Sequence, residues 1–274
     1  MLTFYRTICA VFIGLFIVIF FVGDLTVSAL DLASYFINEL PTDDVSISKL
    51  AKNDVIIFSA DKFTMRKSIV DKIRQKNPNI IMLAYVPSQS YHTIWNPQDY
   101  LFRNMHIKNN WWMRDGSGNI ISTWPGTQNI KMTKEWSEYL VQFTNTYVVS
   151  QPNVDGVFYD VVGDVISWAN NGNIDIDDDG VIDGASKLDA TWLNGTVYFL
   201  QYASQNLKTK YIVTNGSSNS AMQNYINGRM FETFPTPWEY GGNWSMIMSD
   251  LAGNQKYNHY PRLYIINANT NNTG

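Results

Sequence analysis

Short apolar runs that alternate with amphipathic helical segments constrain the fold of this chain more than any other feature. Residues 54–59 and 80–86 are continuous apolar runs, which are typical of strands buried on both faces. Between them, residues 64–76 carry apolar side chains at helical spacing, with charged side chains on the opposite side. This alternation predicts parallel strands that are connected by crossover helices.

The alternation continues along most of the sequence. The predicted strands are 33–38, 54–59, 80–86, 154–160, 211–215, 228–232 and 262–267. The predicted helices are 46–52, 64–76, 134–147, 188–207, 219–225 and 244–257. Seven such strands predict an α/β fold, a (β/α)8 TIM-type barrel, better than they predict an open sheet. Because the sequence stops after the seventh strand, we expect a C-terminally incomplete barrel that lacks its eighth β/α unit.

The N-terminal residues predict export. Arg6 precedes an uncharged apolar run over residues 7–23, and Val27-Ser28-Ala29 has the small-residue pattern of a signal peptidase site. The run is about 17 residues long, at the lower limit for crossing a bilayer. Residues 1–29 are therefore expected to be a signal peptide or an N-terminal anchor. In both cases residues 30–274 form the domain, secreted or on the extracellular face of the membrane.

Composition excludes several classes of partner and site. Cys9, the only cysteine, lies in the export segment, so the domain can form neither a disulfide framework nor a cysteine-ligated zinc site. The net charge of −4 comes with no basic stripe, which argues against nucleic acid as a partner. Aromatic residues make up 14% of the chain, and exposed aromatic rings commonly stack on sugars.

Two of the predicted strands end on an acidic residue. Asp160 closes residues 154–160, and Glu232 closes residues 228–232. An acid at the end of a buried run costs free energy unless it is paired or used. The C-terminal ends of the strands form the floor of the active site in a parallel barrel. Two such acids suit glycosidic bond cleavage, although each could instead cap a helix or form an ion pair.

Four segments carry a family resemblance. They are Val-Asp-Gly-Val-Phe-Tyr-Asp at 154–160, Asp-Ile-Asp-Asp-Asp-Gly-Val-Ile-Asp at 175–183, Asn-Gly-Arg-Met-Phe-Glu-Thr-Phe-Pro at 227–235, and Trp-Trp-x-Arg-Asp-x-x-Gly-Asn at 111–119. With them the chain resembles the TIM-barrel glycoside hydrolases called hypothetical glycosyl hydrolase family 15, which are distantly similar to endo-α-1,4-polygalactosaminidases. The resemblance implies a sugar-cleaving barrel in which Asp160 and Glu232 match the expected catalytic acids.

The acidic segment at 175–183 predicts a calcium loop. The side chains of Asp175, Asp177, Asp179 and Asp183, with the carbonyl of Val181, fit positions one, three, five, nine and seven of an EF-hand-like loop. The twelfth position lacks the usual bidentate acid. A bound Ca²⁺ would be structural, since the predicted catalysis requires no cofactor. The alternative is a solvated loop that caps the following helix.

A long excursion between residues 87 and 131 contributes to the expected substrate surface. It contains a predicted β-hairpin that turns at Asp115-Gly116. Loops of this length in a compact domain are usually functional. The residues expected to bind substrate are Tyr85, Trp112, Arg114, Trp124 and Asn215. Ordinary core packing is the alternative for each tryptophan.

The sequence therefore predicts an enzyme that hydrolyses O-glycosidic bonds in an extracellular polysaccharide or oligosaccharide. Asp160 would act as nucleophile or base and Glu232 as general acid, or the reverse, with retaining and inverting mechanisms both open. The alternative function is a non-catalytic carbohydrate-binding barrel at the cell surface. A membrane tether through residues 7–23 is compatible with either function, and the oligomeric state stays open.

Overall fold

The computed structural model describes residues 32–93 and 104–268, so the predicted export segment at residues 1–29 lies outside the described part. Contacts divide the chain into Met1–Asp31 and Leu32–Gly274, and the description that follows concerns the second unit. Within the described ranges, no helix is both long and apolar enough to span a bilayer.

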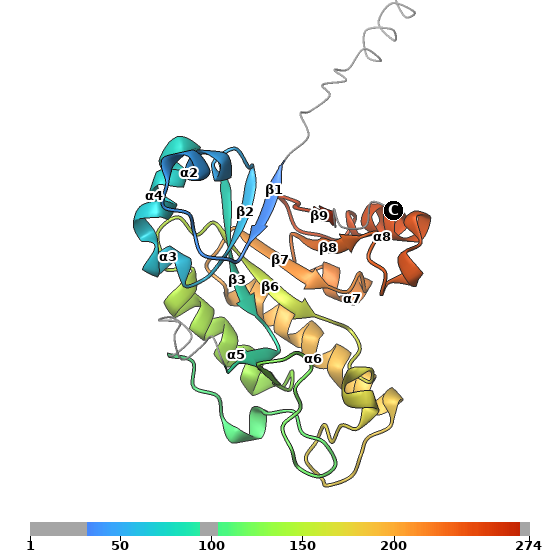
Figure 1. Ribbon diagram of the computed structural model, residues 1–274. Helices are drawn as coiled ribbons and strands as arrows, with labels where there is room; N and C mark the ends of the chain where they lie inside the picture. Colours follow the sequence, from blue (N-terminus) through green and yellow to red (C-terminus); the bar gives the residue numbers. More distant parts are fainter. Residues whose placement is uncertain (1–31, 94–103, 269–274) are drawn as a thin grey trace, which may run out of the picture. The chain divides into compact units, whose positions relative to one another are not determined.

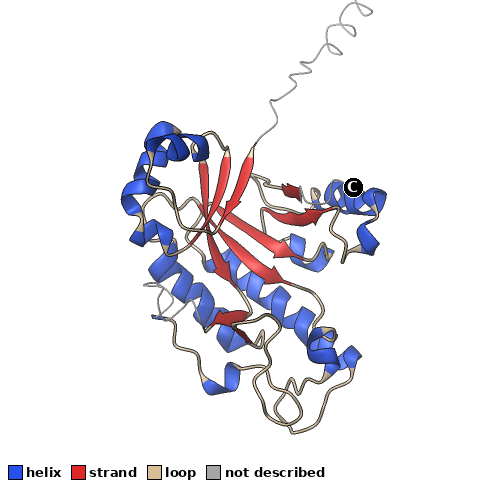
Figure 2. Ribbon diagram, in the orientation of Figure 1, coloured by secondary structure: helices blue, strands red, loops and turns tan. Residues whose placement is uncertain are grey.

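Seven parallel strands form the central sheet (Figure 2), and their order in the sheet follows their order in the sequence. They are β1 (Ala33–Phe36), β2 (Val55–Ser59), β3 (Ile81–Pro87), β6 (Gly156–Val162), β7 (Tyr211–Gly216), β8 (Gly228–Phe234) and β9 (Ile265–Ala268). The expected α/β barrel is confirmed as a nearly closed barrel of seven strands. Among the described residues, β1 and β9 are not paired with each other. That the chain stops before an eighth unit stays a prediction.

Helices follow most of the strands and surround the sheet (Figure 1). They are α2 (Asp44–Leu50), α3 (Lys62–Met65), α4 (Lys67–Lys76), α5 (Lys134–Phe143), α6 (Ala185–Asn206), α7 (Ser220–Gln223) and α8 (Trp244–Asn254). The single helix predicted over residues 64–76 is wrong in one respect, because the chain leaves helical geometry at Arg66, which separates α3 from α4. The other predicted helices are confirmed with shifted ends.

The inner strands β2, β3, β6, β7 and β8 are buried on both faces over most of their length, as their apolar sequences predict, and their alternate residues belong to two separate cores. Side chains between the sheet and the helices form the larger core, which includes Ile56, Met82 and Val157. The inward-facing side chains form the smaller one: Val55, Ile57, Leu83, Tyr85, Phe158, Tyr211, Val213, Met230 and Ile265. Because side chains alternate along a strand, the inward positions that follow Phe158, Val213 and Met230 are Asp160, Asn215 and Glu232.

The excursion after β3 contains a small antiparallel pair, β4 (Ser90–His92) with β5 (Thr127–Asn129). The predicted hairpin is confirmed by an antiparallel bridge between Arg114 and Ile120. However, the glycine with the left-handed backbone is Gly118, with φ 82°, and not Gly116. Gly116 lies against Ile182, where a Cβ would come within 2.6 Å of that side chain. The hairpin thus packs on the acidic segment that precedes α6.

Candidate active site

A single amide group connects the two acids. The Nδ2 atom of Asn215 donates to Oδ1 of Asp160 at 2.9 Å and to Oε2 of Glu232 at 2.8 Å. Two oxygens that share one donor nitrogen at these distances are at most about 6 Å apart. The ends of β6, β7 and β8 therefore bring the two carboxylates together at one mouth of the barrel.

The acids do not close their strands, and this detail of the sequence prediction is wrong. Strand β6 continues to Val162 and β8 continues to Phe234. In each case the residue after the acid is β-branched and left-handed, Val161 with φ 59° and Thr233 with φ 50°. The register with the neighbouring strand shifts at the same two places. Such bulges re-aim side chains, and strained backbone of this kind concentrates at functional sites.

Three donors hold the carboxylate of Asp160. The hydroxyl of Tyr85 donates to Oδ2 at 2.8 Å, and the backbone N–H of Val161 donates to Oδ1 at 2.9 Å, in addition to the Asn215 amide. Burial raises the pKa of Asp160, and the charge of Glu232 adds to the rise, while the three donors oppose it. Burial and the charge of Asp160 in turn raise the pKa of Tyr85, so this hydroxyl stays protonated and keeps donating.

Asp160 and Glu232 line a cavity of ≈ 1550 Å³. Trp124, from the excursion, and Trp168, from the segment after β6, line it, and their ring centroids are 6.2 Å apart. Trp238 and Tyr240, from the segment after β8, also line it, as does Tyr257, which follows α8. Figure 1 places the excursion and the β6–α6 segment together, while α8 lies apart from them beside β8. Aromatic rings from several segments thus line the same cavity as the two acids.

The charge of the cavity lining has one sign. Its carboxyl groups belong to Asp160, Asp164, Glu232, Glu239 and Asp250, and no lysine or arginine is among the described residues that line it. His92 also lines it, and burial lowers the pKa of this histidine, so it is neutral at neutral pH. A ligand with several negative charges would meet repulsion without a compensating cation.

Three of the five residues predicted to bind substrate lie in this cavity: Tyr85, Trp124 and Asn215. Trp112 and Arg114 are not among the residues that line it. Trp112 packs edge-on against Tyr91, and Arg114 donates to the carbonyl of Gly118 and to the side chain of Asn109. Trp112 and Arg114 therefore stabilise the excursion itself, and their position outside the cavity lining does not support a role for them in substrate binding.

Sequence reasoning missed several cavity residues, most notably Trp168, Trp238, Tyr240, Asp250 and Tyr257. All four aromatic side chains among them are exposed, Trp238 to 62%. They follow the strand ends that carry the acids, or lie on and just beyond α8. Aromatic residues soon after Asp160 and Glu232 are the sequence signal that could have identified them, because segments at the C-terminal ends of barrel strands surround the active site.

A buried ion pair holds the loop that carries Trp238 and Tyr240. Arg229, at the start of β8, donates to both carboxylate oxygens of Glu239 at 2.6 and 3.1 Å. It also donates to the hydroxyl of Ser218 at 2.6 Å, and only 1% of its side chain is exposed. The pair therefore ties the segments after β7 and β8 to the barrel.

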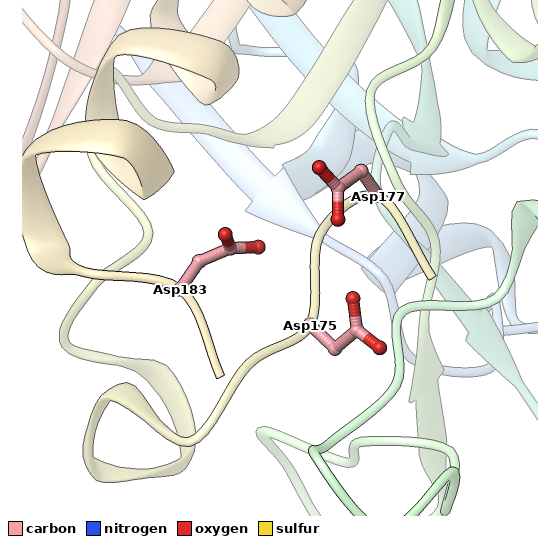
Figure 3. Close-up of side chains that lie close together, drawn as sticks. All are labelled: Asp175, Asp177 and Asp183. Carbon is pink, nitrogen blue, oxygen red and sulfur yellow. The ribbon is translucent and has the colours of Figure 1, made fainter. Parts of the chain in front are cut away.

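The predicted calcium loop brings together three of its four acidic side chains. Carboxylate oxygens of Asp175, Asp177 and Asp183 lie within 4.8 Å of one another (Figure 3). Asp179 instead accepts from the backbone N–H of Val181. The ammonium of Lys187 contacts Asp177 at 2.6 Å and Asp183 at 2.5 Å, so this lysine supplies a positive charge to the group. Calcium binding stays a prediction, for which calorimetric titration should give a saturable heat.

Comparison with known proteins assigns the chain to a family. The sequence matches the hypothetical glycosyl hydrolase family 15 over residues 74–272. No curated protein matches it. Similar solved structures include a cycloisomaltooligosaccharide glucanotransferase of Paenibacillus sp. (10% identity, TM-score 0.50, covering 87% of this chain and 38% of that one). Another is the α-L-fucosidase isoenzyme 2 from Paenibacillus thiaminolyticus (11% identity, TM-score 0.52, covering 78% and 37%). This chain therefore spans less than two fifths of either protein, and the likeness concerns the fold.

Proposed function

The chain belongs to the hypothetical glycosyl hydrolase family 15, and from that premise we propose that it hydrolyses O-glycosidic bonds in an extracellular polysaccharide or oligosaccharide. The observation that carries this proposal is the amide of Asn215, which donates to both Asp160 and Glu232. Glycosidic bond cleavage requires two carboxyl groups on either side of the bond, and the mouth of a parallel barrel is where active sites lie. The apolar run at residues 7–23 supports an extracellular location.

The surroundings of the two acids favour different roles. Asp160 accepts three hydrogen bonds, which oppose the rise that burial causes in its pKa and thereby favour the ionised carboxylate that a nucleophile requires. Oxygen Oε2 of Glu232 accepts from Asn215, and the half-buried side chain lines the cavity. Glu232 is therefore assigned the role of general acid, which protonates the leaving oxygen and afterwards activates water.

The separation of the acids favours a retaining mechanism. Retaining enzymes place the two carboxyl groups roughly 5–5.5 Å apart, whereas inverting enzymes leave about 6.5–9.5 Å for a water molecule. The shared donor Asn215 keeps the nearest oxygens within about 6 Å. Asp160 would then form a covalent glycosyl–enzyme bond as the leaving group departs with the proton of Glu232. Water would hydrolyse that bond in the second step.

The cavity lining favours uncharged sugar units. The lining carries five carboxyl groups, of which Glu239 is paired with Arg229, and no lining lysine or arginine is described, so uronates and sulfated sugars would be repelled. The exposed rings of Trp124, Trp168 and Trp238 offer flat apolar surfaces for the C–H faces of sugar rings. A cavity of ≈ 1550 Å³ with several exposed rings supports a substrate of several units.

The proposal is tested by assaying the full chain on aryl glycosides and neutral polysaccharides, next to the variant Asp160→Asn/Glu232→Gln. We expect hydrolysis of at least one neutral glycan by the wild type and none by the double variant. Equal turnover by the two proteins would exclude these acids as catalytic residues. Retention of a glycan without hydrolysis by the wild type would instead indicate a carbohydrate-binding barrel.

The pH profile should report the hydrogen bond from Tyr85. Activity falls on the acid side as an ionised nucleophile becomes protonated, so the acid limb of kcat/KM follows the pKa of Asp160. In Tyr85→Phe this carboxylate loses a donor that lowers its pKa, and the acid limb should move to higher pH. Tyr159→Phe is the matched control, because its hydroxyl contacts Thr144 in the core outside the barrel and should leave the limb in place. Movement of the alkaline limb alone would assign Asp160 as the acid.

A further inference from the structure

Two polar atoms on helix α8 have no hydrogen-bond partner although both are buried. They are Oδ2 of Asp250 and Nδ2 of Asn254. The two residues are four positions apart, so they lie on the same face of the helix. Buried polar groups are nearly always satisfied, because an unmade hydrogen bond at a buried atom destabilises the folded protein. The pair thus calls for a partner that the described protein atoms do not supply.

This face of α8 forms part of the wall of the cavity. The residues of α8 that line it are Ser249, Asp250, Gly253 and Asn254. Next to Asn254, which is only 5% exposed, Gly253 leaves open space, since a Cβ at that position would meet no atom within 4 Å. Tyr257, which follows α8, also lines the cavity and is 47% exposed. The wall therefore combines open space, an aromatic ring and two unsatisfied polar atoms.

The chemistry of the two atoms specifies what can satisfy both. A carboxylate oxygen only accepts hydrogen bonds, whereas an amide nitrogen only donates. An ammonium group could donate to Asp250, but it has no lone pair to accept from Asn254. A carboxylate or phosphate on the ligand could accept from Asn254, but it would be repelled by Asp250 and by nearby Asp164 and Glu239. Two neighbouring hydroxyl groups fit, because one donates and the other accepts.

The surrounding charges already have protein partners. Glu239 is paired with Arg229, Asp164 accepts from the amide of Asn219, and the carboxylate of Asp250 is close enough to the hydroxyl of Tyr240 to raise its pKa. The buried acceptor without a partner is Oδ2 of Asp250, on a residue one helical turn from Asn254, which carries the buried donor. Hydroxyl pairs on adjacent ring carbons are a general feature of uncharged sugars.

We propose that the α8 wall, defined as Tyr240, Asp250, Gly253, Asn254 and Tyr257, is a second sugar subsite that holds one uncharged unit of the glycan. Asp250 and Asn254 bind two adjacent hydroxyls of that unit, and Tyr257 packs against its C–H face. This subsite lies on a different element from Asp160 and Glu232. It rests on the proposed function only in taking a glycan as the ligand, since it requires no cleavage.

The test measures binding in a background that cannot cleave, Asp160→Asn/Glu232→Gln. This protein is applied to an array of neutral oligosaccharides of two to six glucose, galactose, mannose, xylose or N-acetylglucosamine units, with oligouronates as the anionic set. The best-retained oligosaccharide is then titrated by calorimetry. Asn254→Ala removes the donor, and Gly253→Leu fills the open space without changing a polar group. Ala252→Leu, on an exposed neighbouring position outside the lining, is the matched control.

We expect Asn254→Ala and Gly253→Leu each to weaken binding at least tenfold, with Ala252→Leu within twofold of the background. Retention of no neutral oligosaccharide, preference for oligouronates, or unchanged affinity in both subsite variants would overturn the subsite. Circular dichroism of each variant identifies any loss of folding. If the array retains a glycan that wild-type protein does not hydrolyse, the proposed catalysis fails while the subsite stands.

Discussion

Replacing Glu232 by glutamine should slow hydrolysis of unactivated glycans by about 10²–10⁴-fold, the usual contribution of a general acid. Glutamine keeps the shape of the side chain and can still accept the hydrogen bond from Asn215, but it has no proton to give. An aryl glycoside with a dinitrophenolate leaving group hardly needs that proton. Formation of the glycosyl–enzyme from such a substrate should therefore proceed at nearly the wild-type rate, as measured by the burst of released phenolate.

The variant Asp160→Asn is the matched comparison for this prediction. Asparagine can accept from Asn215 and Val161 while its amide donates to the oxygen of Tyr85, so the local hydrogen bonds can be retained. The nucleophile is lost, and turnover should fall for activated and unactivated substrates alike. If Glu232→Gln instead slowed both substrates equally while Asp160→Asn spared the activated one, the two roles would be exchanged.

Replacing Arg229 by methionine should lower the free energy of unfolding by about 3–5 kcal/mol, the usual cost of breaking a buried ion pair from one side. The side chain of Arg229 is 1% exposed and that of Glu239 is 16% exposed, so the variant leaves a charged carboxylate largely buried without its partner. Urea unfolding followed by circular dichroism measures the change.

Two further variants distinguish the contribution of the buried ion pair to stability from the general effect of replacing a charged side chain. Arg229→Met/Glu239→Gln removes the stranded charge and should recover part of the loss. Lys134→Met breaks an exposed pair with Glu138 at 3.9 Å, and should cost at most about 1 kcal/mol. A loss below about 1 kcal/mol in Arg229→Met would contradict a stabilising role for the buried pair.

The strands could be predicted from sequence because a parallel sheet covered on both faces requires continuous apolar runs, as in residues 54–59 and 80–86. The break between α3 and α4 could not be predicted in this way. The helical spacing of apolar residues continues across it, while Arg66 adopts a non-helical backbone. The turn of the hairpin was predicted at Asp115-Gly116, whereas the left-handed glycine is Gly118, and Gly116 instead lies close to Ile182, a tertiary contact that the sequence does not indicate.

The acids of the site could be found from their position at strand ends, but their local geometry could not. Nothing in the sequence indicates that Val161 and Thr233, both β-branched, adopt left-handed backbone angles. The role of Asn215 as the shared donor depends on three strands meeting, which is a tertiary property. Trp112 was assigned to the substrate surface on residue type alone, and only its contact with Tyr91 reveals a packing role.

The most direct test of the paired-carboxylate account is to add azide to Glu232→Gln during hydrolysis of an activated glycoside. Azide needs no general base, so it should attack the glycosyl–Asp160 bond and restore turnover. The account predicts a glycosyl azide with the same anomeric configuration as the substrate, identified by proton NMR. An azide product of opposite configuration, or no rescue by azide, would contradict the assignment of Asp160 as nucleophile and Glu232 as general acid.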